Sequence, residues 1–128
     1  MLEENKNLVR GFFEAINQQD LVLAEGMLSE QLRWWIIGKA KISGDKDRRS
    51  VRISFKMVFR GFENFAFTLH DITAEGNRVA VTAESRGRHK SGKEYNNHYH
   101  FLFFIEDQQI VQVKEYFDTQ HAIWLEAG

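Results

Sequence analysis

Two carboxylates near the end of the chain are the residues best suited to acid–base chemistry. Glu115 and Asp118 belong to residues 110–118, where alternating apolar residues are typical of a strand. A carboxylate inside an apolar pocket has a raised pKa and can exchange protons near neutrality. Both are therefore candidate catalytic groups, although either could instead pair with Lys114 or cap the segment that follows. Alternation puts Glu115 and Asp118 on opposite faces, so both reach one pocket only if the strand bends at its end.

The preceding aromatic run, residues 95–105, carries a second group of candidates. Tyr99 could donate a hydrogen bond to a developing oxyanion, or its hydroxyl could be satisfied locally in the core. Asn97 is suited to orient a pocket group or to close a turn. His98 and His100 are two residues apart, a spacing that could bind zinc, but no third ligand is evident in sequence. We therefore expect no metal and no cofactor.

Five further residues are candidates for contact with a ligand. Trp34 and Trp35 are adjacent in a short apolar run, so we expect one to line a pocket and the other to pack in the core. Glu84 and Arg86 are two residues apart and share one face of a predicted strand. Phe117 shares the face of the neighbouring candidate acid and could form part of the same wall.

The elements that would position these residues follow from apolar periodicity. Helical spacing predicts three helices, over residues 3–18, 20–28 and 47–61. Alternation and turn residues predict five strands, over residues 32–37, 65–73, 78–90, 95–105 and 110–118. Ser29-Glu30 is expected to close the second helix, and Gly38 and Gly44 to bracket a loop. The tail from Thr119 is expected to fold back on the body.

This order of elements predicts an α+β domain, because helices precede a set of four long antiparallel strands. The 128 residues contain no cysteine and no proline, and we expect a single domain over residues 1–128. The run over residues 95–105 is apolar on both faces, which is typical of a strand covered on both sides. A second copy of the chain is the simplest cover for the outer side, so we expect a homodimer through the sheet.

Composition excludes several classes of partner. The formal net charge is −1 with both signs interspersed, and we expect no nucleic-acid partner. The cluster Lys46-Asp47-Arg48-Arg49 is interpreted as a solvated helix face. No apolar run approaches the ~20 residues of a membrane span, and the acidic, polar N-terminus is unlike a signal peptide. We expect a cytoplasmic protein without a membrane partner.

Three stretches resemble SnoaL-like and ketosteroid-isomerase-like members of the nuclear transport factor 2-like superfamily. They are residues 34–38 with the trailing Ser43-Gly44, residues 91–97 with Tyr99, and residues 114–119. The opening residues 8–16, followed by Asp20, are similar to that family's first two helices. The resemblance implies a cone-shaped, curled antiparallel sheet with three N-terminal-side helices enclosing a deep apolar pocket, and dimers that pack through the sheet.

The resemblance also implies roles for some residues. The steroid isomerases use a carboxylate after the first strand and a tyrosine on the first helix, where this chain has Ile36-Ile37-Gly38 and Phe12-Phe13. That mechanism is therefore not expected. Asp118 resembles the aspartate that SnoaL-like cyclases use as general acid or base. Glu115, with Glu84 and Arg86, could fill the acid–arginine–acid array of limonene-epoxide-hydrolase-like members.

We therefore predict a domain that binds a small, mostly apolar, oxygenated ligand. Glu115 and Asp118 would act as acid and base in isomerase, cyclase or hydrolase chemistry, and Tyr99 would be the hydrogen-bond donor. The alternative is a non-catalytic dimeric module that binds a ligand or recruits a partner protein. The absence of the isomerase base and tyrosine favours this alternative.

Overall fold

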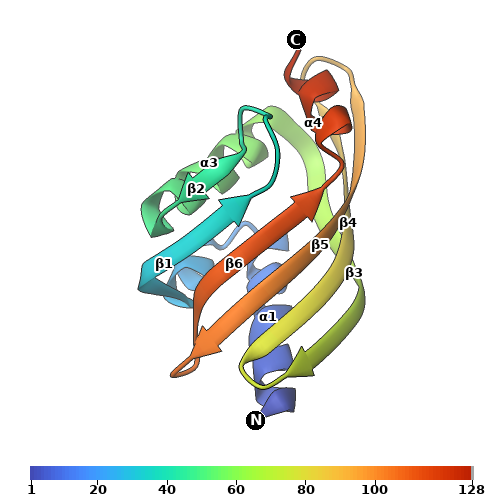
Figure 1. Cartoon of the computed structure of the whole chain (residues 1–128). Helices are drawn as coiled ribbons and strands as arrows, with labels where there is room; N and C mark the ends of the chain where they lie inside the picture. The colour runs from blue at the N-terminus through green and yellow to red at the C-terminus, as the bar shows by residue number, and fades with distance from the viewer. Residues whose placement is uncertain (128) are drawn as a thin grey trace.

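The computed structural model, which describes residues 1–127, is a curled six-stranded sheet with helices packed against one face (Figure 1). We call that face the inner face, and the opposite one the outer face. The helices are α1 (Leu2–Asn17), α2 (Leu21–Gly26), α3 (Arg48–Gly61) and α4 (Thr119–Glu126). The strands are β1 (Leu28–Ile36), β2 (Gly44–Lys46), β3 (Phe62–Glu75), β4 (Arg78–His89), β5 (Glu94–Glu106) and β6 (Gln109–Phe117). The predicted α+β class is confirmed.

The strand order is β2-β1-β6-β5-β4-β3. Strands β3 to β6 form the predicted antiparallel meander, whereas β1 pairs with β6 in parallel. Two details of the sequence prediction are wrong. Ser29 and Glu30 belong to β1 and not to the end of a helix, since the strand already begins at the buried Leu28, which pairs with Ile110. The loop after Gly38 ends in a short strand, β2, in which Asp45 pairs with Trp35.

Helix α1 supplies the centre of the core. Its apolar stripe is wholly or almost wholly buried and consists of Val9, Phe12, Phe13 and Ile16. The Phe13 ring packs against the rings of Phe67, Phe101 and Phe103 from the inner face of the sheet, with centroid separations of 5.2–5.8 Å. Burial of each such side chain stabilises the fold by about 1.5–3 kcal/mol. The helix therefore holds the middle strands in place and leaves the end of the sheet nearer α3 and α4 to form the site.

An aspartate caps the first turn of each of the other three helices. Asp20, Asp47 and Asp118 accept backbone N–H groups of Leu23, Ser50 and His121 at the starts of α2, α3 and α4. Such caps stabilise a helix by about 1 kcal/mol each. Within residues 1–127 no helix has both the length and the apolar composition that crossing a bilayer would need.

Candidate functional site

A cavity of about 440 Å³ lies between the inner face of the sheet and helices α3 and α4. Its wall is mostly aromatic and includes Trp34, Phe55, Phe65, Phe67, Phe101 and Phe117. A few polar groups also reach it, among them Glu115, Tyr99 and Lys46. Small-molecule sites in proteins commonly have this size and this combination of apolar wall and few polar groups.

Glu115 is the one carboxylate buried among these aromatic rings in the described residues, with 8% of its surface exposed. Strand β6 places it between Ile36 of β1 and Phe101 of β5, which are its partners in register. The indole Nε1–H of Trp34 donates to its Oε1 at 2.8 Å. Burial raises the pKa of Glu115 to about 7, against the opposing effects of the Trp34 hydrogen bond and the Lys46 charge. The group is therefore partly ionised at neutral pH, as a proton-transfer residue needs to be.

Tyr99 lies on the same inner face, on β5. Its hydroxyl is hydrogen-bonded to Ser85 Oγ at 2.9 Å, and its ring stacks on Phe101 and Phe117 at 5.3 and 5.7 Å. Burial raises the pKa of Tyr99 well above 10, so the phenol stays protonated. The sequence analysis did not single out Ser85, although alternation on β4 places it on the same face as the buried Ala83.

Asn97 is fully buried but is not part of the cavity wall. Its Nδ2 donates to the Tyr95 hydroxyl at 2.7 Å and to the Asp118 carbonyl at 3.0 Å, and its Oδ1 accepts the N–H groups of His98 and Asp118. The predicted ligand contact is therefore corrected to a positioning role: Asn97 orients Tyr95, which does line the cavity, and fixes the start of α4.

Asp118 lies outside the cavity. Strand β6 ends at Phe117, and the exposed Asp118 is the N-cap of α4, where its Oδ1 accepts the His121 N–H at 3.2 Å. Its assignment as a catalytic group is corrected to helix capping, the other role that the sequence had allowed. The strand does not bend enough to bring both acids to one pocket.

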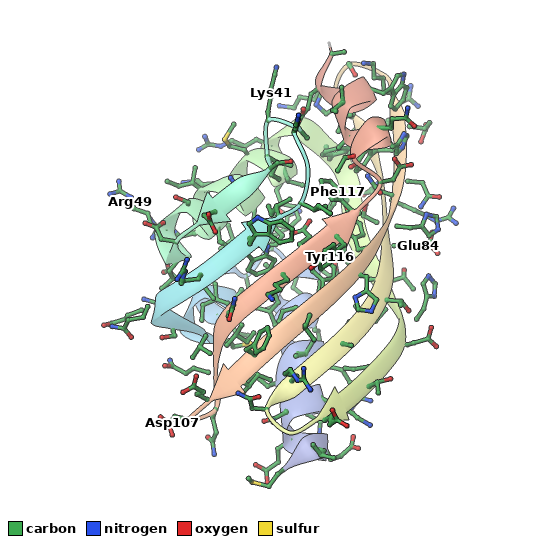
Figure 2. The ribbon with its side chains drawn as sticks, viewed as in Figure 1. Lys41, Arg49, Glu84, Asp107, Tyr116 and Phe117 are labelled. Carbon is green, nitrogen blue, oxygen red and sulfur yellow. The ribbon has the colours of Figure 1, made fainter. Side chains whose placement is uncertain are left out.

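Glu84, Arg86 and Trp35 lie on the outer face of the sheet and not in the cavity; Glu84 is labelled in Figure 2. The Glu84 carboxylate accepts from Asn96 and Arg86 at 2.9 and 3.3 Å and is 2.9 Å from His70 Nε2. The Asn96 hydrogen bond, with further help from His70 and Arg86, lowers the pKa of Glu84. Because the sheet separates this group from Glu115, the acid–arginine–acid array is not assembled.

Of the tryptophan pair, Trp34 takes the pocket position, while Trp35 packs edge-to-face on Tyr116 at 5.4 Å on the outer face. The expectation that the second tryptophan packs in the core is thus wrong: the one-residue step puts Trp35 on the outer face, and the helices pack against the inner face alone. His98 and His100 are also exposed there. Among residues 1–127 no three His, Cys, Asp or Glu side chains are grouped so that they could hold a metal ion.

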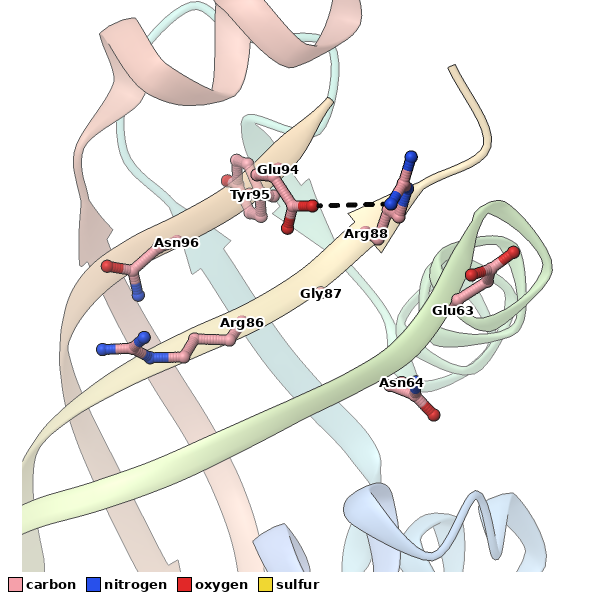
Figure 3. A pocket seen from close by; sticks show the side chains of 8 residues that line it. All are labelled: Glu63, Asn64, Arg86, Gly87, Arg88, Glu94, Tyr95 and Asn96. Carbon is pink, nitrogen blue, oxygen red and sulfur yellow. Dashed lines mark ion pairs between the residues drawn. The ribbon is translucent and has the colours of Figure 1, made fainter. Parts of the chain in front are cut away.

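A second hollow, of about 370 Å³, lies at the ends of β3, β4 and β5 (Figure 3). It is lined by charges of both signs, and Arg88 faces Glu94 across it at 3.9 Å. Gly87 forms part of its floor, where an added Cβ would come within 3.1 Å of Phe65 Cα. The hollow contains neither Glu115 nor Tyr99, so the aromatic cavity is the better candidate site.

The curled sheet, its three N-terminal-side helices and its strand order define an α+β protein of the nuclear transport factor 2-like class. Within that class, the chain belongs to the SnoaL-like domain family, whose model matches residues 9–113. A search of curated protein sequences returned no significant match.

Solved structures show the same fold at low sequence identity. PrhC from Penicillium brasilianum NBRC 6234 superposes with a TM-score of 0.89 at 16% identity, over 98% of this chain and 87% of its own. An NTF2-like protein of unknown function from Burkholderia pseudomallei K96243 gives 0.86 at 20% identity, over 98% of each chain. IdmH from Streptomyces antibioticus, a candidate polyketide cyclase, gives 0.81 at 18% identity, over 97% of this chain and 99% of its own.

Proposed function

We propose that the cavity binds a small, mostly apolar, oxygenated molecule and that Glu115 transfers a proton to or from it. The observation that carries the proposal is a buried carboxylate with a pKa of about 7 at the wall of an aromatic cavity. In its ionised form such a group is a stronger base than an ordinary carboxylate because little water solvates it, and in its neutral form it is an acid at physiological pH.

Two neighbours of Glu115 have defined parts in this proposal. Trp34 holds the carboxylate in one orientation through the 2.8 Å hydrogen bond. Tyr99, which stays protonated, offers its O–H to an oxygen of the ligand on which negative charge develops. Isomerisation, cyclisation and elimination next to a carbonyl all need this pair, a base for a C–H proton and a donor for the oxygen.

The proposal can be tested with nitrobenzisoxazole, a chromogenic probe whose ring opening needs only a base. The Glu115 carboxylate would take the ring C–H proton, the C–H electron pair would form the nitrile, and the N–O bond would break to release a coloured phenolate. The rate should rise with pH, half-maximal near the pKa of about 7, because the base must be ionised. Glu115→Gln should reduce the rate by at least about 100-fold.

Asp118→Asn is the matched control, because asparagine still caps a helix and Asp118 lies outside the cavity. It should leave the probe reaction unchanged. An undiminished rate in the Glu115→Gln variant, or a midpoint near the ordinary value of 4.5, would contradict general-base chemistry at this residue.

The rival function is binding without catalysis. It is favoured by the fact that Glu115 is the one buried acid of the cavity in the described residues, since the other carboxylate of the wall, Glu126, is only half-buried and accepts the Lys41 backbone N–H at 2.9 Å. Native mass spectrometry before and after denaturing extraction would detect a retained molecule. A retained apolar compound together with no Glu115-dependent reaction would favour a binding module.

We further propose that two copies pair through the outer face of the sheet. Trp35, Tyr116, Leu102 and Phe104 give this face an apolar strip along β1, β6 and β5, and Tyr116 is 37% exposed. Light scattering coupled to size exclusion should give a dimer for the wild type and a monomer for Tyr116→Glu. A monomeric wild type would contradict the pairing.

A further inference from the structure

The solvent side of α3 is a continuous basic stripe. Its exposed positions are spaced three and one apart, so they lie on one face of the helix. Four of the six side chains are basic, two are apolar and none is acidic: Arg49, Arg52, Ile53, Lys56, Met57 and Arg60. In Figure 2 the Arg49 side chain extends from the molecule into solvent. We call these six residues the α3 face.

Positive charge is concentrated around this face far beyond the chain average. Residues 39–60 contain eight Lys or Arg and two Asp, a net formal charge of +6, whereas the whole chain has −1 and the remainder therefore −7. Asp47 is engaged as the cap of α3, and Glu25 pairs with Arg52 at 3.5 Å. Within residues 1–127, Arg52 is the one member of the α3 face that forms an ion pair.

The two apolar members of the α3 face are exposed to solvent. Met57 is 65% and Ile53 43% exposed, and both lie between basic neighbours on the helix. Phospholipid headgroup regions combine phosphate charge with a nearby apolar layer, and basic helices with apolar side chains bind there. The sequence alone led us to expect no membrane partner and a solvated face at the start of this helix, but the exposed apolar residues between the charges change that interpretation. We propose that the α3 face docks on an anionic phospholipid surface.

The position of the cavity supports a lipid surface over an acidic protein. Met57 belongs both to the α3 face and to the cavity wall, to which Lys41 and Lys46 also contribute. Docking would thus bring the cavity next to the bilayer, where a mostly apolar ligand is most concentrated. That advantage rests on the proposed function, whereas the docking itself rests on the charge and exposure of α3.

Co-sedimentation with vesicles tests the proposal. The protein should bind vesicles of phosphatidylcholine mixed with phosphatidylserine, should ignore pure phosphatidylcholine, and should be released by salt. Each basic residue near an anionic bilayer strengthens binding by about fivefold, so Arg49→Gln with Lys56→Gln should weaken it by about 25-fold. The double variant Arg78→Gln with Arg88→Gln removes the same charge from other exposed sites and should bind like the wild type.

Two further measurements separate the outcomes. Ile53→Ser with Met57→Ser should lower the binding that persists at high salt, and Glu115→Gln should bind vesicles normally, so failure of catalysis and failure of docking are distinguishable. The proposal would be overturned if the wild type bound neutral and anionic vesicles equally well. It would also be overturned if Arg49→Gln with Lys56→Gln and Arg78→Gln with Arg88→Gln weakened vesicle binding by the same factor. Tighter binding to polyglutamate or duplex DNA than to the anionic vesicles would overturn it in favour of another polyanion.

Discussion

Glu115 and Glu84 lie on opposite faces of one sheet, and their pKa values shift in opposite directions. On the inner face, burial raises the pKa of Glu115 to about 7, although Trp34 donates a hydrogen bond to it. On the outer face, the hydrogen bond from Asn96, with His70 and Arg86 nearby, lowers the pKa of Glu84. The comparison shows that one donor does not offset desolvation, whereas several donors beside solvent stabilise the ionised form.

The largest expected effect of this difference is on stability against pH. Glu115 binds its proton more tightly in the folded than in the unfolded chain. Its contribution to the free energy of unfolding is therefore fully present below about pH 4.5 and is lost as pH rises through about 7. The shift corresponds to about 3 kcal/mol of unfolding free energy. Chemical denaturation across this window should show the loss in the wild type and not in Glu115→Gln. If the unfolding free energies of the wild type and Glu115→Gln changed in parallel with pH, the raised pKa of Glu115 would be contradicted.

Trp34→Phe should sharpen the comparison by removing the single donor on the inner side. The pKa of Glu115 should then rise above 7, because the Trp34 hydrogen bond lowers it. The lost hydrogen bond should cost about 1–3 kcal/mol of stability where the carboxylate is ionised. Carboxyl carbon NMR titration and denaturation would measure both. Trp35→Phe is the control on the outer face, and a similar shift there would contradict the assignment.

Asp118→Ala tests whether the second acid belongs to the inner side at all. Loss of the α4 cap should cost about 1 kcal/mol of unfolding free energy. The nitrobenzisoxazole rate per folded molecule should stay within about twofold of wild type. A loss of rate on the scale of Glu115→Gln would restore Asp118 as a catalytic residue.

Glu84→Gln should have the smallest effect, with the opposite sign. The folded chain holds the ionised form of Glu84, so its contribution is present above the ordinary pKa of 4.5 and is lost as pH falls through the folded value. The variant should therefore be slightly less stable than wild type at neutral pH and equal to it in acid. If the variant instead became more stable than wild type as pH rises, burial would be raising the pKa of Glu84 as it does for Glu115.

Much of the fold could be predicted because it depends on local periodicity. The stripe of α1, from Val9 to Ile16, and the alternation in β3 to β6 recur at spacings that only one type of element accommodates. Alternation also placed Glu115 and Phe117 together and could have found Ser85 by the same rule. No such pattern predicts that Lys46 reaches the cavity, because its strand, β2, has only three residues and no apolar alternation.

The chain itself determined that Trp34 and Trp35 face opposite ways and that Glu115 and Phe117 face the same way, since side chains alternate between the two faces of any extended strand. Only the tertiary structure decided which side is enclosed. Parallel pairing of β1 with β6 brings Trp34 within hydrogen-bonding distance of Glu115, 81 residues away, and α3 and α4 then close the cavity around them. Desolvation of a carboxylate depends on everything packed around it, and therefore on contacts that no local stretch of sequence contains.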